Sequence, residues 1–196
     1  FDSATPGREG PWVTFARMSM LRTPKQLTGP ELGIASLSFR AFWEAQHGAE
    51  GWEAMYRVPR TAWMDYLNWF RRVMALPVIN GWRLAALEPV ADGPAERFAR
   101  SVVLATGAMG AGGYAVPEEI ARAVPADRVV HAMDVFDTAV FRGRRVGILG
   151  AGATAFDLAV VALQQGATRA EVCVRRPALP RDNPRRWMVP AGFLAH

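Results

Sequence analysis

The sequence has a single cysteine, Cys173, among 196 residues. This excludes an intramolecular disulfide, a CxxC metal site and a redox-active cysteine pair. The sequence also lacks a run of about 18 apolar residues, and it has no basic segment followed by an apolar one, so neither a membrane span nor a signal peptide is expected. These absences favour a reducing compartment, and we expect a cytoplasmic protein with no membrane partner.

Lysine is almost absent, because Lys25 is the only lysine among 23 basic residues. Protein surfaces that bind a phosphate backbone usually contain both lysine and arginine. The excess of arginine over lysine therefore suggests a coding preference rather than a nucleic-acid-binding surface. The formal net charge is +5, and residues 175–186 supply five arginines and one aspartate. About four of the five charges therefore gather in one short segment, and no nucleic-acid partner is expected.

Known hydrolase and metalloenzyme motifs are missing too. There is no GxSxG, no HExxH and no Cys–His pair, so these two classes have no support and no metal site is expected. Asp65 and Asp134 are isolated in the sequence, which gives no acid–base pair. No catalytic residue can be named from the sequence.

The composition itself, with 51% apolar and 21% charged residues, is that of an ordinary globular protein of one to two domains. Residues 1–57 are rich in proline and glycine, and a short helix is expected at 39–46. A second helix is expected within residues 59–75, behind a Thr61 cap, because apolar side chains recur there at helical spacing: Trp63, Leu67, Phe70 and Met74.

The region after this helix has the pattern of short strands. Residues 78–79, 82–87 and 98–106 predict a small antiparallel meander, with turns between them. A short helix is expected at 118–124 and a further strand at 129–131.

The most regular part of the chain follows. It predicts a strand at 145–149, a helix at 153–165 and a second strand at 170–174, which together make one βαβ unit. The helix is expected to group its apolar side chains on one face: Phe156, Ala159, Val160 and Leu163. The fold class is therefore α/β, with a Rossmann-like parallel unit beside the meander and helical elements.

A GxGxxA motif, Gly150-Ala-Gly152-Ala-Thr-Ala155, joins the first strand of this unit to the helix. Gly150 permits the tight turn, Gly152 lets the backbone approach a pyrophosphate, and the helix N-terminus at Ala153 and Thr154 offers free N–H groups. The motif predicts dinucleotide binding. A glycine turn that serves only packing is the alternative.

The end of the second strand indicates which dinucleotide. Glu171 opens that strand, whereas a ribose ligand belongs at its carboxyl end, where Arg175 and Arg176 stand. Two guanidinium groups there favour the 2′-phosphate of NADPH over NADH. The alternative is that both are solvated charges, and Arg181, Arg185 and Arg186 either add to the same site or are exposed.

Several motifs together resemble the class B flavoprotein monooxygenases, which include flavin-containing and Baeyer–Villiger monooxygenases. They are the Leu-Ala105-Thr106-Gly107 strand end, His131 and the Gly150 motif. The resemblance implies that an FAD fold and an NADPH fold meet near Ala105, Thr106 and Gly107. His131 matches the family pattern only in part. It is either a hinge residue or a cofactor contact, or it simply ends a strand.

The resemblance also implies that Trp12 and Lys25 lie beside the flavin. The family's N-terminal GxGxxG is absent from the sequence, so we expect a missing FAD-binding segment or a partner chain to supply it. Residues 1–128 would then be partial FAD-domain and linker elements, and residues 129–196 the NADPH-binding Rossmann unit.

The expected activity is that of an FAD- and NADPH-dependent monooxygenase acting on a small organic substrate. A flavin reductase without oxygenation would share every motif named above. A non-catalytic NADPH-binding module and a basic nucleic-acid binder are further alternatives.

Overall fold

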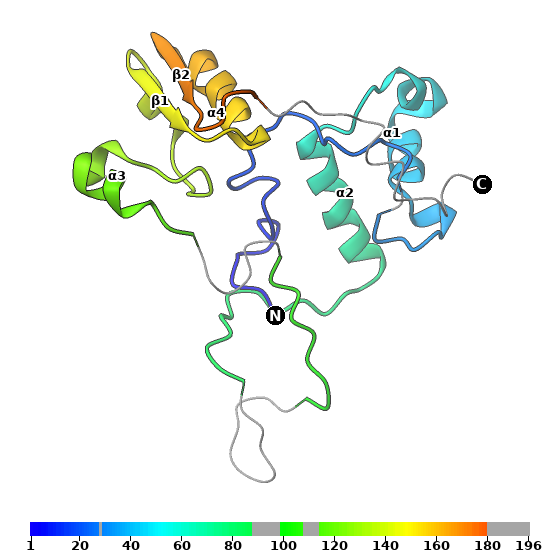
Figure 1. Cartoon of the computed structure of the whole chain (residues 1–196). Helices are drawn as coiled ribbons and strands as arrows, with labels where there is room; N and C mark the ends of the chain where they lie inside the picture. The colour runs from blue at the N-terminus through cyan, green and yellow to red at the C-terminus, as the bar shows by residue number, and fades with distance from the viewer. Residues whose placement is uncertain (28, 88–98, 108–113, 180–196) are drawn as a thin grey trace. The chain divides into compact units, whose positions relative to one another are not determined.

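The computed structural model describes residues 1–27, 29–87, 99–107 and 114–179 (Figure 1). The chain divides into two compact units, Phe1–Val135 and Phe136–His196, which are considered separately. Among the described residues, no helix combines the length and the apolar character needed to cross a membrane.

The core of the first unit lies around two helices, α1 (Phe39–Ala54) and α2 (Arg60–Val73). The predicted helix at 39–46 is confirmed, and it continues beyond Gly48, where a positive φ of 70° kinks it. Glycine adopts this conformation at little cost. One hydrophobic cluster joins both helices to the segments before them: Leu21, Phe39, Trp52, Met55, Val58, Tyr66 and Phe70.

Helix α2 confirms the second predicted helix, but the Thr61 cap is wrong. Pro59 is the N-cap residue, without a side-chain hydrogen bond, and Thr61 is exposed inside the first turn. The fixed φ of proline suits a helix start, so no hydroxyl cap is needed there. The aromatic side chains of α2 pack against the hydrophobic cluster, with Tyr66 fully buried.

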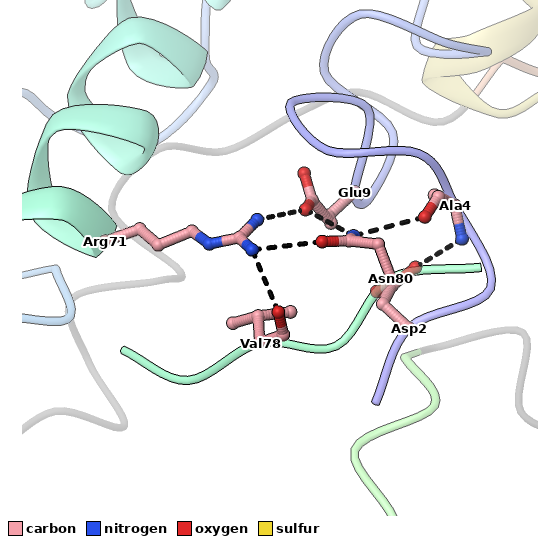
Figure 2. A network of polar contacts seen from close by, with 6 residues as sticks. All are labelled: Asp2, Ala4, Glu9, Arg71, Val78 and Asn80. Atoms are coloured by element: carbon pink, nitrogen blue, oxygen red, sulfur yellow. Dashed lines mark hydrogen bonds and ion pairs between the residues drawn. The ribbon is translucent and has the colours of Figure 1, made fainter. Parts of the chain in front are cut away.

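A polar network ties the C-terminal end of α2 to the N-terminal segment (Figure 2). Arg71 donates to the Glu9 carboxylate at 2.6 Å and, through its other terminal nitrogen, to Val78 O and Asn80 Oδ1, both at 3.0 Å. Asn80 in turn donates to Glu9 at 2.7 Å and to Ala4 O at 3.1 Å. These side chains reinforce backbone hydrogen bonds between the same two segments, among them Asp2 N–H to Ile79 O at 2.9 Å.

The predicted antiparallel meander and the strand at 129–131 are wrong. Residues 78–87 and 99–106 contain no strand, and residue 98 lies outside the described residues. The pairing found there is one isolated bridge, Asp2 with Asn80. Val103 is 87% exposed, so the apolar pattern of this segment has no sheet partner to bury it.

In the part of the chain that the structure describes, the remaining helical elements are α3 and three 3₁₀ turns. The predicted helix at 118–124 is confirmed as α3 (Glu118–Ala123), and 3₁₀ turns lie at Ala35–Leu37, Ala126–Arg128 and Thr138–Phe141. Residues 129–131 do not form a strand because a turn begins at His131, whose carbonyl accepts from the N–H of Asp134 at 2.9 Å.

The second unit holds β1 (Arg145–Leu149), α4 (Ala153–Gln164) and β2 (Arg169–Cys173). The two strands are parallel and in register from Arg145↔Arg169 to Leu149↔Cys173. The predicted strand, helix and strand are thus confirmed. The fold is mixed helix and strand, with a small two-stranded parallel sheet.

The face of α4 that packs inward is not the one on which the predicted apolar group lies. Its buried residues are Ala155, Leu158 and Ala162. The expected face is largely exposed, with exposures of 39% for Phe156, 53% for Val160 and 54% for Leu163. Both faces of α4 are apolar, so periodicity alone cannot choose between them. The small alanines allow the helix to approach the sheet closely.

Candidate functional site

The glycine turn between β1 and α4 has the backbone that its sequence requires. Gly150 adopts a φ of 142°, which only glycine populates readily. Its N–H donates to Cys173 O at 3.0 Å, so the turn starts beside the end of β2. Ala155 is buried, and a Cβ at position 150 would lie 3.8 Å from its Cβ. Ala155 thus lets the helix sit close to the turn.

The start of α4 is open to a ligand. Gly152 is the N-cap residue and makes no side-chain cap, and a Cβ at this position would meet no atom within 4 Å. The N–H groups in the first turn of a helix have no intrahelical acceptor and carry partial positive charge. Gly152 and Ala153 are exposed and Thr154 is half-buried. These residues fit a pyrophosphate.

Arg175 and Arg176 lie just beyond β2 and are exposed. Since Leu149 pairs with Cys173, the glycine turn and these arginines follow neighbouring strands at the same edge of the sheet. Glu171 lies inside β2 and forms ion pairs with Arg145 and Arg169. Arg181, Arg185 and Arg186 are outside the described residues.

The first unit contains a second candidate site, a cavity of about 260 Å³ that we call the Trp12 pocket. It brings together Trp12 and Lys25, the two residues expected beside a flavin. The indole rings of Trp12 and Trp63 meet edge to face, with centroids 6.3 Å apart. The pocket is lined by Trp12, Leu21, Thr23, Pro24, Lys25, Leu27, Gly29, Phe39, Val58 and Trp63.

Trp12 is held in place through its backbone. The guanidinium of Arg60, at the start of α2, donates to the Trp12 carbonyl. The backbone N–H of Arg60 donates to Ser19 O at 3.0 Å, and Leu21 N–H donates to Val58 O at 2.8 Å. The irregular N-terminal segment is therefore fixed against the start of α2.

Lys25 has a structural contact that the sequence did not reveal. Its ammonium donates to Trp52 O in the last turn of α1, and it lies 4.6 Å from the centroid of the Trp52 ring. A cation there stabilises the exposed carbonyls of a helix end. Lys25 is half-buried and lies where the pocket wall and the end of α1 meet.

Glu31, Gly29 and Tyr66 form a buried polar group behind the pocket that sequence reasoning missed. The Glu31 carboxylate, 5% exposed, accepts from Gly29 N–H at 2.7 Å and faces the Tyr66 hydroxyl at 3.3 Å. Tyr66 also donates to Leu37 O at 2.8 Å. Burial, together with the charge and hydrogen bond of Glu31, raises the pKa of Tyr66, so the hydroxyl remains a donor.

The remaining predicted residues, Ala105, Thr106 and Gly107, lie in an exposed segment that forms no strand. Gly107 has a φ of 76°. The structure describes no secondary structure that would position these three residues for a cofactor.

Asp134 is isolated in the sequence but not in the structure. It accepts from the Tyr114 hydroxyl and, at 2.8 Å, from the N–H of His131, whose ring stacks on Tyr114 with centroids 4.0 Å apart. The hydrogen bonds from Tyr114 and His131 lower the pKa of Asp134, and the Tyr114 bond raises the pKa of that phenol. Among the described residues, no cluster of three or more acidic, His or Cys side chains could hold a metal.

Comparison with known proteins gives one informative match. The chain is 52% identical, over an alignment of 202 residues, to "FAD-dependent urate hydroxylase" from Xanthomonas campestris pv. campestris. The alignment covers 98% of this chain and 43% of the relative. The chain is a homologue of an FAD-dependent hydroxylase. It spans less than half the length of that relative. No protein-family profile and no solved structure matches the sequence.

Proposed function

We propose that this chain is the NADPH-binding part of an FAD-dependent monooxygenase that hydroxylates urate or a closely similar small molecule. The observation that carries the proposal is 52% identity to the urate hydroxylase over almost the whole chain. At this identity, the turn, helix and pocket described above are expected in the relative as well.

The second unit supplies the groups that bind NADPH. Gly150, Gly152, Ala153 and Thr154 hold the pyrophosphate through backbone N–H groups at the start of α4. Arg175 and Arg176 bind the 2′-phosphate at the neighbouring strand end. The unit thus orients the nicotinamide, while the two cofactors supply hydride transfer and oxygen activation when bound.

The first unit fits FAD only in part. A cavity of about 260 Å³ is smaller than the usual ~300–1,000 Å³ of pockets for whole drug-sized ligands, so it can receive one ring system and not the dinucleotide. Trp12 and Lys25 would contact the flavin side, with Ala105, Thr106 and Gly107 at the junction. We propose that a further segment or a partner chain binds the rest of FAD, and we assign no catalytic residue.

NADPH specificity tests the cofactor assignment directly. Arg175→Ala should weaken NADPH binding by about 1–3 kcal/mol, the worth of a charged hydrogen bond, and leave NADH binding nearly unchanged. Isothermal titration calorimetry with both nucleotides measures this. Arg122→Ala removes an exposed arginine from α3 and is the matched control. Equal losses for both nucleotides would contradict the assignment.

Oxygen consumption tests the hydroxylase assignment. In the protein supplied with its whole FAD-binding part, urate should stimulate NADPH oxidation and O₂ uptake equally, with little peroxide released. Urate-independent peroxide release would instead identify a flavin reductase.

A further inference from the structure

We propose that a groove at the C-terminal end of α1 binds a carboxylate group through the guanidinium of Arg57. The groove has a volume of about 530 Å³ and lies between residues 24–26 and residues 53–57. We call it the Arg57 groove. Among the described residues, only Pro24 and Lys25 line both this groove and the Trp12 pocket. The inference goes beyond the proposed function, because it requires neither of the two cofactors nor the substrate named there.

Hydrogen bonds fix the two walls of the groove to each other. Leu21 N–H donates to Val58 O at 2.8 Å, and the Lys25 ammonium donates to Trp52 O. The two acceptors come just after and just before the lining residues 53–57. Met55 lines the groove and also belongs to the hydrophobic cluster of the core. The groove is therefore preformed, which lowers the entropy cost of binding a ligand.

Arg57 has a donor that the protein does not satisfy. Its Nη1 atom is buried, and no residue in the described part of the chain accepts a hydrogen bond from it. The guanidinium carbon lies 5.4 Å from the centroid of the Tyr56 ring, a cation–π contact that favours this position. A buried charged donor without an acceptor is costly. A carboxylate suits it well, because its two oxygens match two parallel N–H groups of a guanidinium.

The opposite wall of the groove offers further donors. The Lys25 ammonium keeps N–H groups beyond the one that it donates to Trp52 O. Gln26 lines the groove next to it, and its exposed side-chain amide has two N–H groups. Donors therefore come from both walls, as a bound anion requires, whereas an arginine that serves only solubility needs no such surroundings.

The charges of the groove favour a singly charged anion. Lys25 and Arg57 are its cations and Glu53 is its carboxylate, so one positive charge remains for a ligand to neutralise. The exposed Glu53 side chain and the partial negative charge at the end of α1 both repel a second negative charge. A carboxylate is therefore favoured over a phosphate dianion. It can come from a free organic acid or from a polypeptide.

The test is a titration of the whole chain with acetate, followed by heteronuclear NMR at constant ionic strength, because salt screens exposed charges. Backbone amide signals of residues 25–26 and 53–57 should shift and saturate at about 1–10 mM acetate. Arg57→Gln should weaken binding by about tenfold or more, as expected for a charge-assisted hydrogen bond. Arg57→Lys keeps the charge and loses the planar fork, so its affinity should fall between the two. Arg83→Gln is the matched control, since Arg83 is exposed and outside the groove.

Glu53→Gln tests the charge argument and does not depend on whether Arg57→Gln folds. Without the Glu53 carboxylate, acetate should bind about threefold more tightly. Inorganic phosphate, which should bind the wild type more weakly than acetate, should gain more than acetate does. Glu53 is exposed, so the substitution should leave the fold intact, and circular dichroism checks this for each variant.

A second titration, with the amide of N-acetyl-aspartic acid, distinguishes the two sources of a carboxylate. Tighter binding of this compound than of acetate identifies a polypeptide side chain as the ligand, and binding no tighter identifies a free organic acid. The inference is overturned if acetate gives no saturable shift at about 10 mM, which would show that water alone satisfies Arg57. It is also overturned if phosphate binds the wild type more tightly than acetate, or if Arg83→Gln weakens binding as much as Arg57→Gln.

Discussion

At the scale of single residues, Tyr66 has two roles: its ring packs in the core, and its hydroxyl forms hydrogen bonds with buried polar groups. Its side chain is fully buried, and its hydroxyl reaches both the Leu37 carbonyl and the buried Glu31 carboxylate. A buried carboxylate without donors is costly. Tyr66 and the Gly29 N–H therefore make it possible for Glu31 to be buried behind the pocket.

Removal of the Tyr66 hydroxyl should destabilise the fold. Tyr66→Phe removes the one O–H that the Leu37 carbonyl and the Glu31 carboxylate share, and should cost about 1–3 kcal/mol of unfolding free energy. Urea unfolding measures the change. Tyr56 is 79% exposed, so Tyr56→Phe should change stability by less than about 0.5 kcal/mol. Equal effects of the two substitutions would show that the hydroxyl of Tyr66 contributes nothing.

Sequence reasoning identified residues that belong to local motifs and missed those defined by tertiary contacts. Gly150 was recognised because its turn is bounded by a strand and a helix in the sequence. Gly29 and Glu31 have no such local signature, because their roles depend on Trp63 and Tyr66, more than thirty residues away in the chain. Trp63 belongs to the apolar spacing that predicts α2, but nothing local in the sequence indicates its place in a pocket wall.

At the scale of elements, the contact between α2 and the N-terminal segment depends on ionisation. Burial alone would raise the pKa of Glu9, but hydrogen bonds from Asn80 and from backbone N–H groups, with the charge of Arg71, lower it from 4.5. A lowered pKa in the folded state means that the ionised form stabilises the fold. This stability is present above the unfolded pKa and is lost as the pH falls through the folded value.

Stability measured against pH should reveal this group. The wild type should lose unfolding free energy as the pH falls below about 4.5, whereas Glu9→Gln should lose less over the same range, having no proton to gain at this position. Urea unfolding at several pH values provides the measurement, with Glu119→Gln on exposed α3 as control. A pH dependence of Glu9→Gln as steep as that of the wild type would contradict the assignment.

The two glycines of the β1–α4 turn should respond differently to alanine. Gly150→Ala forces a side chain into a φ of 142° and should cost about 1–3 kcal/mol of stability. Gly152 has a φ of −81° and open space around it, so Gly152→Ala should leave stability nearly unchanged and weaken NADPH binding. Urea unfolding and calorimetry separate the two effects. A loss of stability without a loss of binding in Gly152→Ala would favour a turn that serves only packing.

Helices and strands that depend on local sequence patterns could be predicted. Strands that depend on a partner far away in the sequence could not. The helices α2 and α4 and the strands β1 and β2 follow from spacing and from the glycine turn between them. Residues 82–87 and 99–106 have strand-like side chains, but a strand needs a hydrogen-bonded neighbour, and the described residues supply none. The sequence does not identify the inward face of α4, because its opposite face is equally apolar.

At the scale of the whole molecule, the chain consists of two compact units, and each carries a candidate cofactor site. The residues proposed for the pyrophosphate and the 2′-phosphate belong to the second unit, and the Trp12 pocket belongs to the first. The net charge of +5, examined by position, is concentrated after β2. Most of the net charge of the chain therefore comes from the segment that follows β2.

NADPH should stabilise only the unit that binds it. A ligand present at 100 times its Kd adds about 2.7 kcal/mol to the folded state that binds it. Hydrogen exchange followed by mass spectrometry should therefore slow in peptides spanning β1, α4 and β2, with little change in α1 and α2. NADH at equal concentration should protect the same peptides less. Protection confined to α1 and α2 would place the nucleotide elsewhere.

The anchoring of Trp12 has a consequence for engineering. The Arg60 guanidinium donates its hydrogen bond to the main-chain oxygen of Trp12 and not to the indole. Any side chain with a compatible backbone can therefore be placed at this position without loss of the anchoring hydrogen bond. A saturation library at position 12 would therefore keep the carbonyl contact and change only what the indole contributes, its packing on the hydrophobic cluster and its edge-to-face contact with Trp63.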